Sequence, residues 1–370
     1  MQEVRPGVWR LRVYAGRRPN GSPIQISKTV YGGVRIAARE LAKLVTSVDS
    51  GKIGADVGTF GDLLDRWLEH CKALGRSPTT LREYRRIAEK VIRPDLGRLK
   101  LNKLTAAHLD RLYQKLTEKG AKPATVRRVH ALIGASLHQA ERWDLVERNV
   151  ARRASPPPVH QARVEAPSPE EVRRIIEAAE VLDPGLASLL VVAALTGARR
   201  GELCALRWSD VDLAGGVITI ARSVYETPGG GWGEKATKTH AARTVGLDDL
   251  GMAVLQRQWA ATETLAAELE LAVPPDGFVW SRSPVGSEPV RPDVLTKFAK
   301  RVAAKAGVDT HLHALRHFSA TQAIAAGFDP VTVSGRLGHS DPSITLRVYS
   351  HALVQRDKEL AVALGRTLMA

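Results

Sequence analysis

The C-terminal part of the sequence carries side chains that can act on a phosphate group. Arg199 follows a Thr196-Gly197-Ala198 step, and Glu202 stands three residues further on. His313 and Arg316 stand at i and i+3, so a helix would place both on one side. Arginine suits planar, bidentate recognition of phosphate oxygens. These residues predict a phosphate-binding site in which Glu202 holds the Arg199 guanidinium by a bidentate ion pair.

A nucleophile for phosphate chemistry follows in the sequence. His339 lies in a Leu-Gly-His step, and Tyr349 comes ten residues later. A tyrosine can form a covalent phosphoester, although its ordinary pKa of about 10 makes it weak at neutral pH. Nearby cations favour the phenolate. The pattern therefore predicts phosphoryl transfer to Tyr349 in which positioning and charge stabilisation do most of the work.

The elements that carry these residues follow a proline-rich segment. Residues 151–167 contain a proline triplet and no helical period, which is typical of a linker. Ser168, Pro169 and Glu171 then give the start signal of a helix. We predict a mixed α/β domain over residues 168–370. It contains a buried helix at the apolar run Leu186–Leu195 and a hairpin near residues 217–247.

Residues 56–150 predict a domain of four amphipathic helices. Thr59 caps the first, Ser77 and Pro78 open the second, and the third runs from Thr105 to Gly120. The fourth runs from Pro123 to about Arg142. Cations on the outer faces predict contacts with DNA phosphates, and the candidates are Arg82, Arg85, Arg86, Arg127 and Arg128. The alternative is that each is a solvated surface cation.

Residues 1–52 predict a small sheet followed by a helix near residues 33–48. Apolar Trp9, Leu11 and Val13 alternate with cations in the first strand, and a second strand fits residues 23–30. Only these two strands are convincing from the pattern. A sheet with a cationic face can enter a DNA groove, for which we nominate Arg10, Arg12, Arg18 and Lys28. An edge sheet with solvated cations fits the segment equally well.

The charge distribution favours a polyanionic partner. The chain has 370 residues and a net charge of +15. Residues 1–150 carry 29 Lys/Arg and 15 Asp/Glu, or +14, whereas residues 151–370 carry 25 against 24. Nucleic acid is the usual partner of such a region, although basic soluble surfaces are also common. Two cysteines, no secretory signal and no apolar run long enough for a membrane span predict a cytoplasmic protein without disulfides.

Together these motifs resemble the tyrosine recombinase family, also called phage-type integrases. The family pattern is T-G-x-R-x-x-E-L, then H-x-x-R, then L-G-H followed by a tyrosine. Arg199, His313, Arg316, His339 and Tyr349 occupy these positions. The family also uses a lysine in the turn of a β-hairpin, often in a K-T step. Lys238 fits it, with Lys235 as the nearby competitor.

The resemblance implies a role for each of these residues. Tyr349 would be the nucleophile, and Arg199 and Arg316 would hold the scissile phosphate. His313 would do acid/base work, and His339 would hydrogen-bond the phosphate. Lys238 would be the general acid for the leaving 5′ hydroxyl. Glu202 would buttress Arg199.

The resemblance also implies the fold, the function and the partners. The fold would be mainly α with small β elements: an arm-type DNA-binding domain over 1–52, a core-binding domain over 56–150 and a catalytic domain of the DNA breaking-rejoining type over 168–370. The protein would be an integrase that acts on a phage or mobile element through a 3′-phosphotyrosine intermediate, without cofactor or metal. Its partners would be double-stranded DNA at arm-type and core-type sites, three further protomers in a tetramer on DNA, a host DNA-bending protein and an excisionase.

Other functions fit parts of the same pattern. A chromosome-dimer resolvase of the same family shares the motifs, but such enzymes generally lack an arm domain. A non-cleaving DNA-binding regulator would not need Tyr349, and a type IB topoisomerase would share the chemistry without exchange between two sites. A zinc site at His311, His313, His317 and His339 is disfavoured, because Arg316 stands among them and no acidic or cysteine ligand is near.

Overall fold

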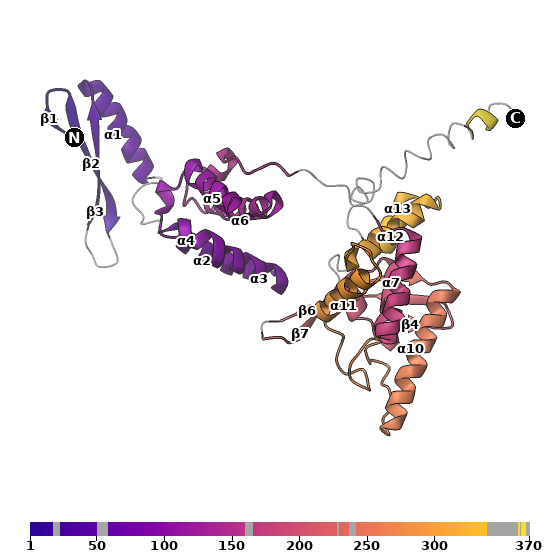
Figure 1. The fold of residues 1–370 in the computed structure, drawn as a ribbon. Coiled ribbons are helices and arrows are strands. Elements are labelled where there is room, and N and C mark those ends of the chain that lie inside the picture. The colour runs from indigo at the N-terminus through magenta and orange to yellow at the C-terminus, as the bar shows by residue number, and fades with distance from the viewer. Residues whose placement is uncertain are drawn as a thin grey trace. The chain divides into compact units, whose positions relative to one another are not determined.

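The protein is described by a computed structural model that covers residues 1–17, 23–49, 58–159, 166–227, 229–236, 242–338, 362 and 364–367. The chain divides into two compact units, Met1–Gln161 and Ala162–Ala370. The division falls within the predicted linker at 151–167. Among the described residues, no helix is long and apolar enough to cross a membrane. The fold is mainly helical with small sheets, as predicted (Figure 1).

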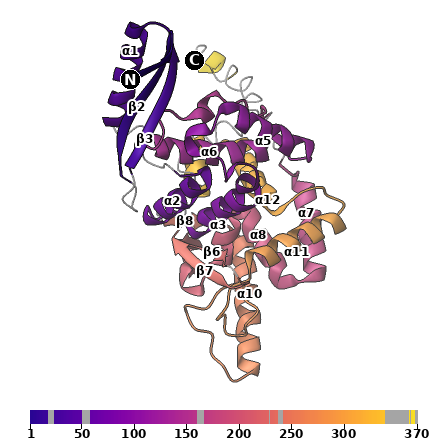
Figure 2. The ribbon, with the colours of Figure 1, turned by 90° about the vertical axis from the view of Figure 1, so that its left-hand side faces the viewer.

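The first unit begins with a three-stranded antiparallel sheet in the order β1-β2-β3. The strands are β1 (Gln2–Arg5), β2 (Val8–Arg17) and β3 (Pro23–Tyr31). The sequence pattern indicated only β2 and β3. All four residues of β1 are exposed, so this strand lacks the apolar alternation that would reveal it. Helix α1 (Val34–Asp49) covers one face of the sheet (Figure 2).

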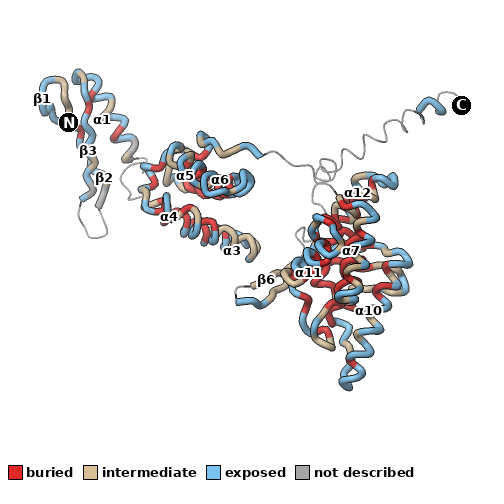
Figure 3. The backbone as a smooth tube through the Cα atoms, in the orientation of Figure 1, coloured by how far each residue is buried: buried red, intermediate tan, exposed pale blue. Residues whose placement is uncertain are grey.

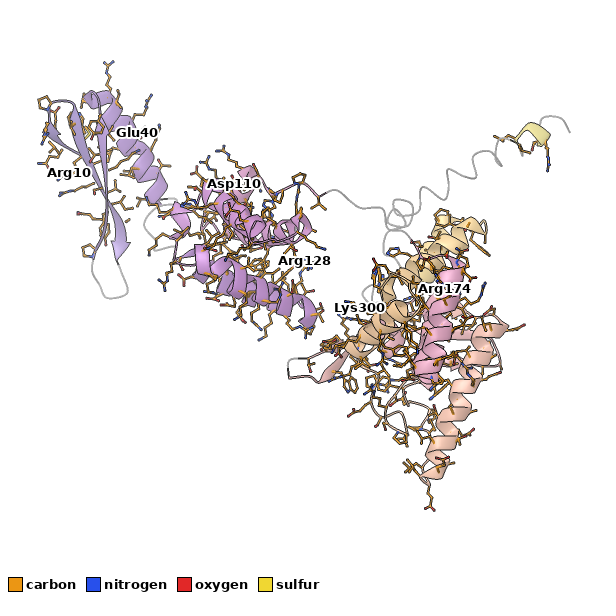
Figure 4. The ribbon with its side chains drawn as sticks, in the orientation of Figure 1. Arg10, Glu40, Asp110, Arg128, Arg174 and Lys300 are labelled. Carbon is orange, nitrogen blue, oxygen red and sulfur yellow. The ribbon has the colours of Figure 1, made fainter. Side chains whose placement is uncertain are left out.

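The two faces of this sheet differ in character. Leu11 is fully buried and packs with Ala37 and Leu44 of α1. Arg10 and Arg12 alternate with Leu11 and are exposed, as the period of two predicts. Figure 4 labels Arg10 on the sheet. Lys28 pairs with Leu11 across the strands and therefore lies on the helix side.

Residues 58–153 of the first unit are mainly helical. The helices are α2 (Phe60–Ala73), α3 (Pro78–Ile87), α4 (Arg93–Leu96), α5 (Ala106–Glu118) and α6 (Pro123–Arg142). Thr59 caps α2, as predicted, and accepts a hydrogen bond from the Asp62 amide. The predicted second helix continues through a π-helical turn at Ala88–Ile92 into the short α4. The buried residues of these helices form one apolar core, and Figure 3 shows buried residues in red.

The second unit is built around a buried helix. Helix α8 (Pro184–Thr196) is buried almost throughout, as the apolar run predicts. Its neighbours include α7 (Pro169–Leu182), α10 (Asp249–Glu268) and α12 (Leu312–Ala325). Further helices in the described part of this unit are α9 (Arg200–Cys204), α11 (Pro292–Lys305) and α13 (Pro330–Leu337). Ser168 and Glu171 form the predicted capping box of α7.

The predicted hairpin near 217–247 is present in two parts. Strand β5 (Val217–Ile220) pairs with β8 (Arg243–Gly246), and β6 (Arg222–Glu226) pairs with β7 (Trp232–Ala236). The short β4 (Val211–Asp212) completes the sheet β4-β5-β8. Strand β5 leads into β6, and the glycines at 229–231 form the turn from β6 to β7. Strand β8 then pairs with β5 again.

Candidate active site

Arg199 lies where two elements meet. Helix α8 ends at Thr196, and Gly197 takes a left-handed conformation with φ +62°. Arg199 has extended backbone and is the N-cap residue of α9. A glycine is required at 197 because an added Cβ would lie 2.4 Å from Leu337 Cδ2 and 3.2 Å from Ser319 Cβ. The turn therefore presses against α12 and α13 and fixes the start of α9.

The predicted ion pair between Arg199 and Glu202 is present, but it is not bidentate. Arg199 Nη1 donates to Glu202 Oε1 at 2.8 Å. Glu202 Oε2 accepts instead from the Arg199 backbone amide at 2.9 Å and from Arg243 Nη2 at 2.6 Å. The carboxylate is thus shared between two guanidinium groups, and Arg243 takes the place that a second Arg199 donor would need.

Arg316 is buried in the same region. It is 4% exposed, and Nη1 donates to the carbonyls of Gly197 at 2.6 Å and Leu337 at 2.8 Å. Arg199 Nη2 donates to the next carbonyl, that of Gly338, at 2.7 Å. Arg243 Nε donates to the Arg336 carbonyl at 2.9 Å.

Three guanidinium groups therefore take three consecutive carbonyls at the end of α13. A helix C-terminus leaves its last carbonyls without partners inside the helix and carries partial negative charge. Cations from β8, α12 and the start of α9 satisfy both needs here. Gly338 has a left-handed conformation at φ +68° and ends the helix. His339 is the next residue in the sequence.

His313 and Arg316 share one side of α12, as their spacing predicts, and both line a cavity of about 230 Å³. Its other polar lining residues are Arg200, Thr296 and His311. Arg200 Nη1 donates to Thr296 Oγ1 at 2.7 Å. The His313 ring lies edge-to-face with the His317 ring at a centroid distance of 5.0 Å.

The electrostatic environment keeps the imidazoles neutral and Glu202 ionised. Partial removal from water, followed by the charges of Arg316 and His311, lowers the pKa of His313. Burial, followed by His313 and Arg316, lowers the pKa of His317 to about 4. Burial raises the pKa of Glu202, but its hydrogen bonds and attraction to Arg243 and Arg199 outweigh that effect, and the pKa lies below its usual value.

Three predicted catalytic residues, Lys238, His339 and Tyr349, lie outside the described residues. Lys238 belongs to the connection from β7 to β8, and these strands pair with different partners. Its competitor Lys235 lies on β7, where its Nζ is 5.5 Å from the centre of the Tyr225 ring.

Arg243 is the residue that the motif pattern missed. Its side chain is 11% exposed and joins Glu202 to the end of α13. The sequence places it at the start of a short strand, where a cation is usually solvated. Neither of its partners is near it in the sequence, since Glu202 is 41 residues and Arg336 is 93 residues away. Only the fold could reveal these contacts.

The nominated DNA-binding cations that the structure describes are all exposed, and Arg18 lies outside the described residues. For Lys28, Arg86, Arg128 and Arg127, the contacts are with acidic or backbone groups of the protein. Lys28 Nζ lies 2.7 Å from Glu40, Arg86 contacts Glu83 at 2.8 and 2.9 Å, and Arg128 lies 3.5 Å from the same carboxylate. Arg127 Nε donates to the Pro157 carbonyl at 3.0 Å. Figure 4 labels Arg128 on the helical part of the first unit.

The histidine-based zinc alternative has no support in the described part of the chain. No group of three or more His, Cys, Asp or Glu side chains there could hold a metal ion. His339 is outside this part. The positive charge of Arg316, which lowers the pKa of His313, also opposes a second cation at this position.

Comparison with known proteins identifies relatives along most of the chain. The phage integrase family model matches residues 168–356, and the model of its N-terminal SAM-like domain matches residues 59–117. The chain is 27% identical to a "Tyrosine recombinase XerC-like" of Caldanaerobacter subterraneus subsp. tengcongensis, over 93% of this chain and 92% of that protein. It is 23% identical to the ICEBs1 integrase of Bacillus subtilis, over 82% of each.

The fold is shared with a solved integrase. A lambda integrase tetramer bound to a Holliday junction matches with a TM-score of 0.62 and 18% identity, over 94% of this chain and 96% of that one. The match extends over both units, and the family model alone covers half of the chain. This chain therefore belongs to the phage integrase family and is a tyrosine recombinase.

Proposed function

We propose that the protein cleaves and rejoins DNA through a 3′-phosphotyrosine intermediate at Tyr349, with Arg199, Arg316, His313, His339 and Lys238 as the catalytic set. The observation that carries the proposal is the meeting of Arg199 and Arg316 at the end of α13, one and two residues before His339. His313 lines the same cavity as Arg316. Arg199 and Arg316, which are far apart in the sequence, thus bond to neighbouring carbonyls of the chain.

The arginines would supply the charge stabilisation. A guanidinium has five N–H donors in a planar fork. The bonds of Arg199 to Glu202 and Gly338 use two of these, and the side chain is 29% exposed. Its remaining donors suit the non-bridging oxygens of a phosphate, whose charge grows in the transition state.

The remaining residues would carry out the nucleophilic attack and the proton transfers. Tyr349 Oη attacks phosphorus, and the bond from phosphorus to the 5′ oxygen breaks. His313, neutral at pH 7 because its pKa is lowered, can accept the phenol proton. Lys238 gives a proton to the leaving 5′ oxygen, and His339 donates a hydrogen bond to the phosphate. Attack of a 5′ hydroxyl on the phosphotyrosine reverses these steps and reseals the strand without ATP.

The cations of the first unit would hold the DNA. Arg10, Arg12 and Arg18 serve an arm-type site, and the helical cations serve a core-type site. Lys28 lies on the helix side of the sheet and pairs with Glu40, so the proposal does not include it. The solved lambda integrase tetramer on a Holliday junction supports four protomers acting together. The natural substrate would be a phage or mobile element in a bacterial cell, where a host DNA-bending protein and an excisionase would set the direction.

A nicked suicide substrate tests the proposal. Cleavage near the nick releases a short fragment, so the protein should remain covalently bound as a 3′-phosphotyrosine adduct. Tyr349→Phe should abolish the adduct, and Tyr225→Phe, a matched change on β6, should not. Arg199→Ala and Arg316→Ala should lose cleavage and keep DNA binding, whereas Arg257→Ala, which removes an exposed partner of Glu180, should retain both.

The same assay separates the alternatives. DNA binding without any adduct by the native chain would refute the cleavage proposal and favour the regulator. Relaxation of supercoiled DNA without exchange between two sites would favour a topoisomerase. Resolution of chromosome-dimer sites by a chain that lacks residues 1–52 would favour the resolvase, because the integrase proposal assigns those residues to a required arm site.

A further inference from the structure

We propose that Arg243 is a positioning residue of the recombination reaction, which fixes Arg199 through Glu202 and fixes the end of α13 directly. The inference rests on the proposed function, since it assumes that Arg199 holds the scissile phosphate. It assigns Arg243 no contact with DNA or with the reacting atoms.

The first link runs from Arg243 to Arg199. Glu202 has two carboxylate oxygens, and Arg199 Nη1 holds one at 2.8 Å. Arg243 Nη2 donates to the other at 2.6 Å, beside the Arg199 backbone amide at 2.9 Å. The Glu202 side chain is 1% exposed. Because water cannot easily replace a lost partner at such a position, removal of Arg243 would leave this oxygen to the Arg199 amide, and the carboxylate would shift together with the Arg199 guanidinium that is bonded to it.

The second link runs from Arg243 to the end of α13, which directly precedes His339 in the sequence. Arg243 Nε donates to the Arg336 carbonyl at 2.9 Å. The guanidinium also lies against Gly338, where an added Cβ would be 2.8 Å from Nη1 and 3.0 Å from Cζ. The Gly338 carbonyl in turn accepts from Arg199 Nη2. Arg243, Glu202, Arg199 and the end of α13 therefore form a closed ring of contacts.

The third link is the position of Arg243 on the backbone. It is the first residue of β8 and pairs with Ile220 of β5. The connection that contains Lys238 ends directly before this strand. Arg243 thus joins three parts of the catalytic set through one side chain: the Arg199 step, the approach to His339 and the strand that follows Lys238.

The contacts explain why an arginine is needed at 243. A lysine has the charge but a single nitrogen, so it cannot donate along two directions of a planar fork. An alanine would leave the buried Glu202 with Arg199 as its one remaining charged partner among the described contacts. A misplacement of about 1 Å in a reacting group can lower a rate about 10²-fold, which sets the scale of the expected loss.

The test is single-turnover cleavage of the nicked suicide substrate by the full chain, with DNA affinity measured separately. Arg243→Ala should cleave about 10²-fold more slowly and bind DNA with unchanged affinity. Arg243→Lys should recover part of the rate. The matched control is Arg207→Ala. Arg207 is also largely buried and paired, in this case with Glu234, but it does not bond to Glu202 or α13. It should cleave at the native rate.

A double-mutant cycle distinguishes positioning from general loss of stability. If Arg243 acts through Glu202, then Arg243→Ala combined with Glu202→Gln should cleave no more slowly than the worse single variant. The pH dependence gives a second readout. With Arg243 removed, Glu202 loses the group that most lowers its pKa, so the factor by which Arg243→Ala slows cleavage should grow as the pH falls toward the ordinary range of a carboxyl group, whereas the titration of His313 is common to both chains. A purely structural role would leave this factor constant.

The outcomes are separable. Cleavage at the native rate by a folded Arg243→Ala chain overturns the inference, as do multiplicative effects of the two substitutions. Arg199→Ala is the reference. If it also cleaves normally, then the proposed catalytic set is wrong. If it is inactive while Arg243→Ala is normal, then only the positioning role fails.

Discussion

The glycine turn before Arg199 gives a quantitative prediction. Gly197 has φ +62°, and its α-carbon faces Leu337 and Ser319. A left-handed conformation costs a residue with a Cβ about 1–2 kcal/mol. The added methyl group also overfills a packed site, which costs about 1–3 kcal/mol. Gly197→Ala should therefore lower the free energy of unfolding of the second unit by about 2–5 kcal/mol.

A matched substitution separates the two terms. Gly307 has nearly the same φ, +67°, but an added Cβ would meet no atom within 4 Å. Gly307→Ala should therefore lose only the conformational term of about 1–2 kcal/mol. Hydrogen exchange of the α8 amides measures the unfolding of this unit by itself, because α8 is its buried central helix.

The same pair of variants should differ in activity. The Gly197 carbonyl accepts a hydrogen bond from Arg316 Nη1 at 2.6 Å, and Arg199 is two residues further along the chain. Displacement of this turn should slow cleavage about 10²-fold, whereas Gly307→Ala should cleave normally. Equal losses of stability in the two variants would refute the crowding argument. Normal cleavage by Gly197→Ala would show that the turn does not position the arginines.

Three further predictions concern charge. The pKa of Glu202 is below its ordinary value of 4.5. The native chain should therefore have a higher free energy of unfolding than Glu202→Gln, and this difference should be greatest above pH 4.5 and shrink as the pH falls further. A difference in urea titrations that does not change with pH would contradict this. The pKa of His317 is lowered to about 4 from 6.5, so its NMR titration should have a midpoint near pH 4. Stability should fall as the pH drops from 6.5 toward 4, because the unfolded chain binds the proton first, and His317→Phe should reduce this fall and leave the part that His313 contributes. For DNA binding, Arg85→Ala should reduce the slope of log affinity against log salt by about 0.9 if it contacts one phosphate. Arg86→Ala should change it less, because Glu83 already holds that guanidinium; equal slopes would count against this ranking.

Local signals in the sequence were sufficient for many elements. The caps Thr59 and Ser168 start α2 and α7 because each side chain bonds to its own helix three residues on. The run of apolar residues at Leu186–Leu195 predicts a helix buried on every side, and α8 is one. Local signals failed for β1, whose residues are all exposed and carry no periodic pattern.

The candidate site divides in the same way. The residue types and spacing of Arg199, His313 and Arg316 were sufficient to nominate a phosphate site, because that chemistry is a property of the side chains themselves. Tertiary structure alone decided which groups hold them. Arg243 reaches Glu202 across 41 residues, and Arg316 reaches Gly197 across 119. Such contacts depend on how strands and helices pack, and no pattern along the chain encodes the distance between their ends.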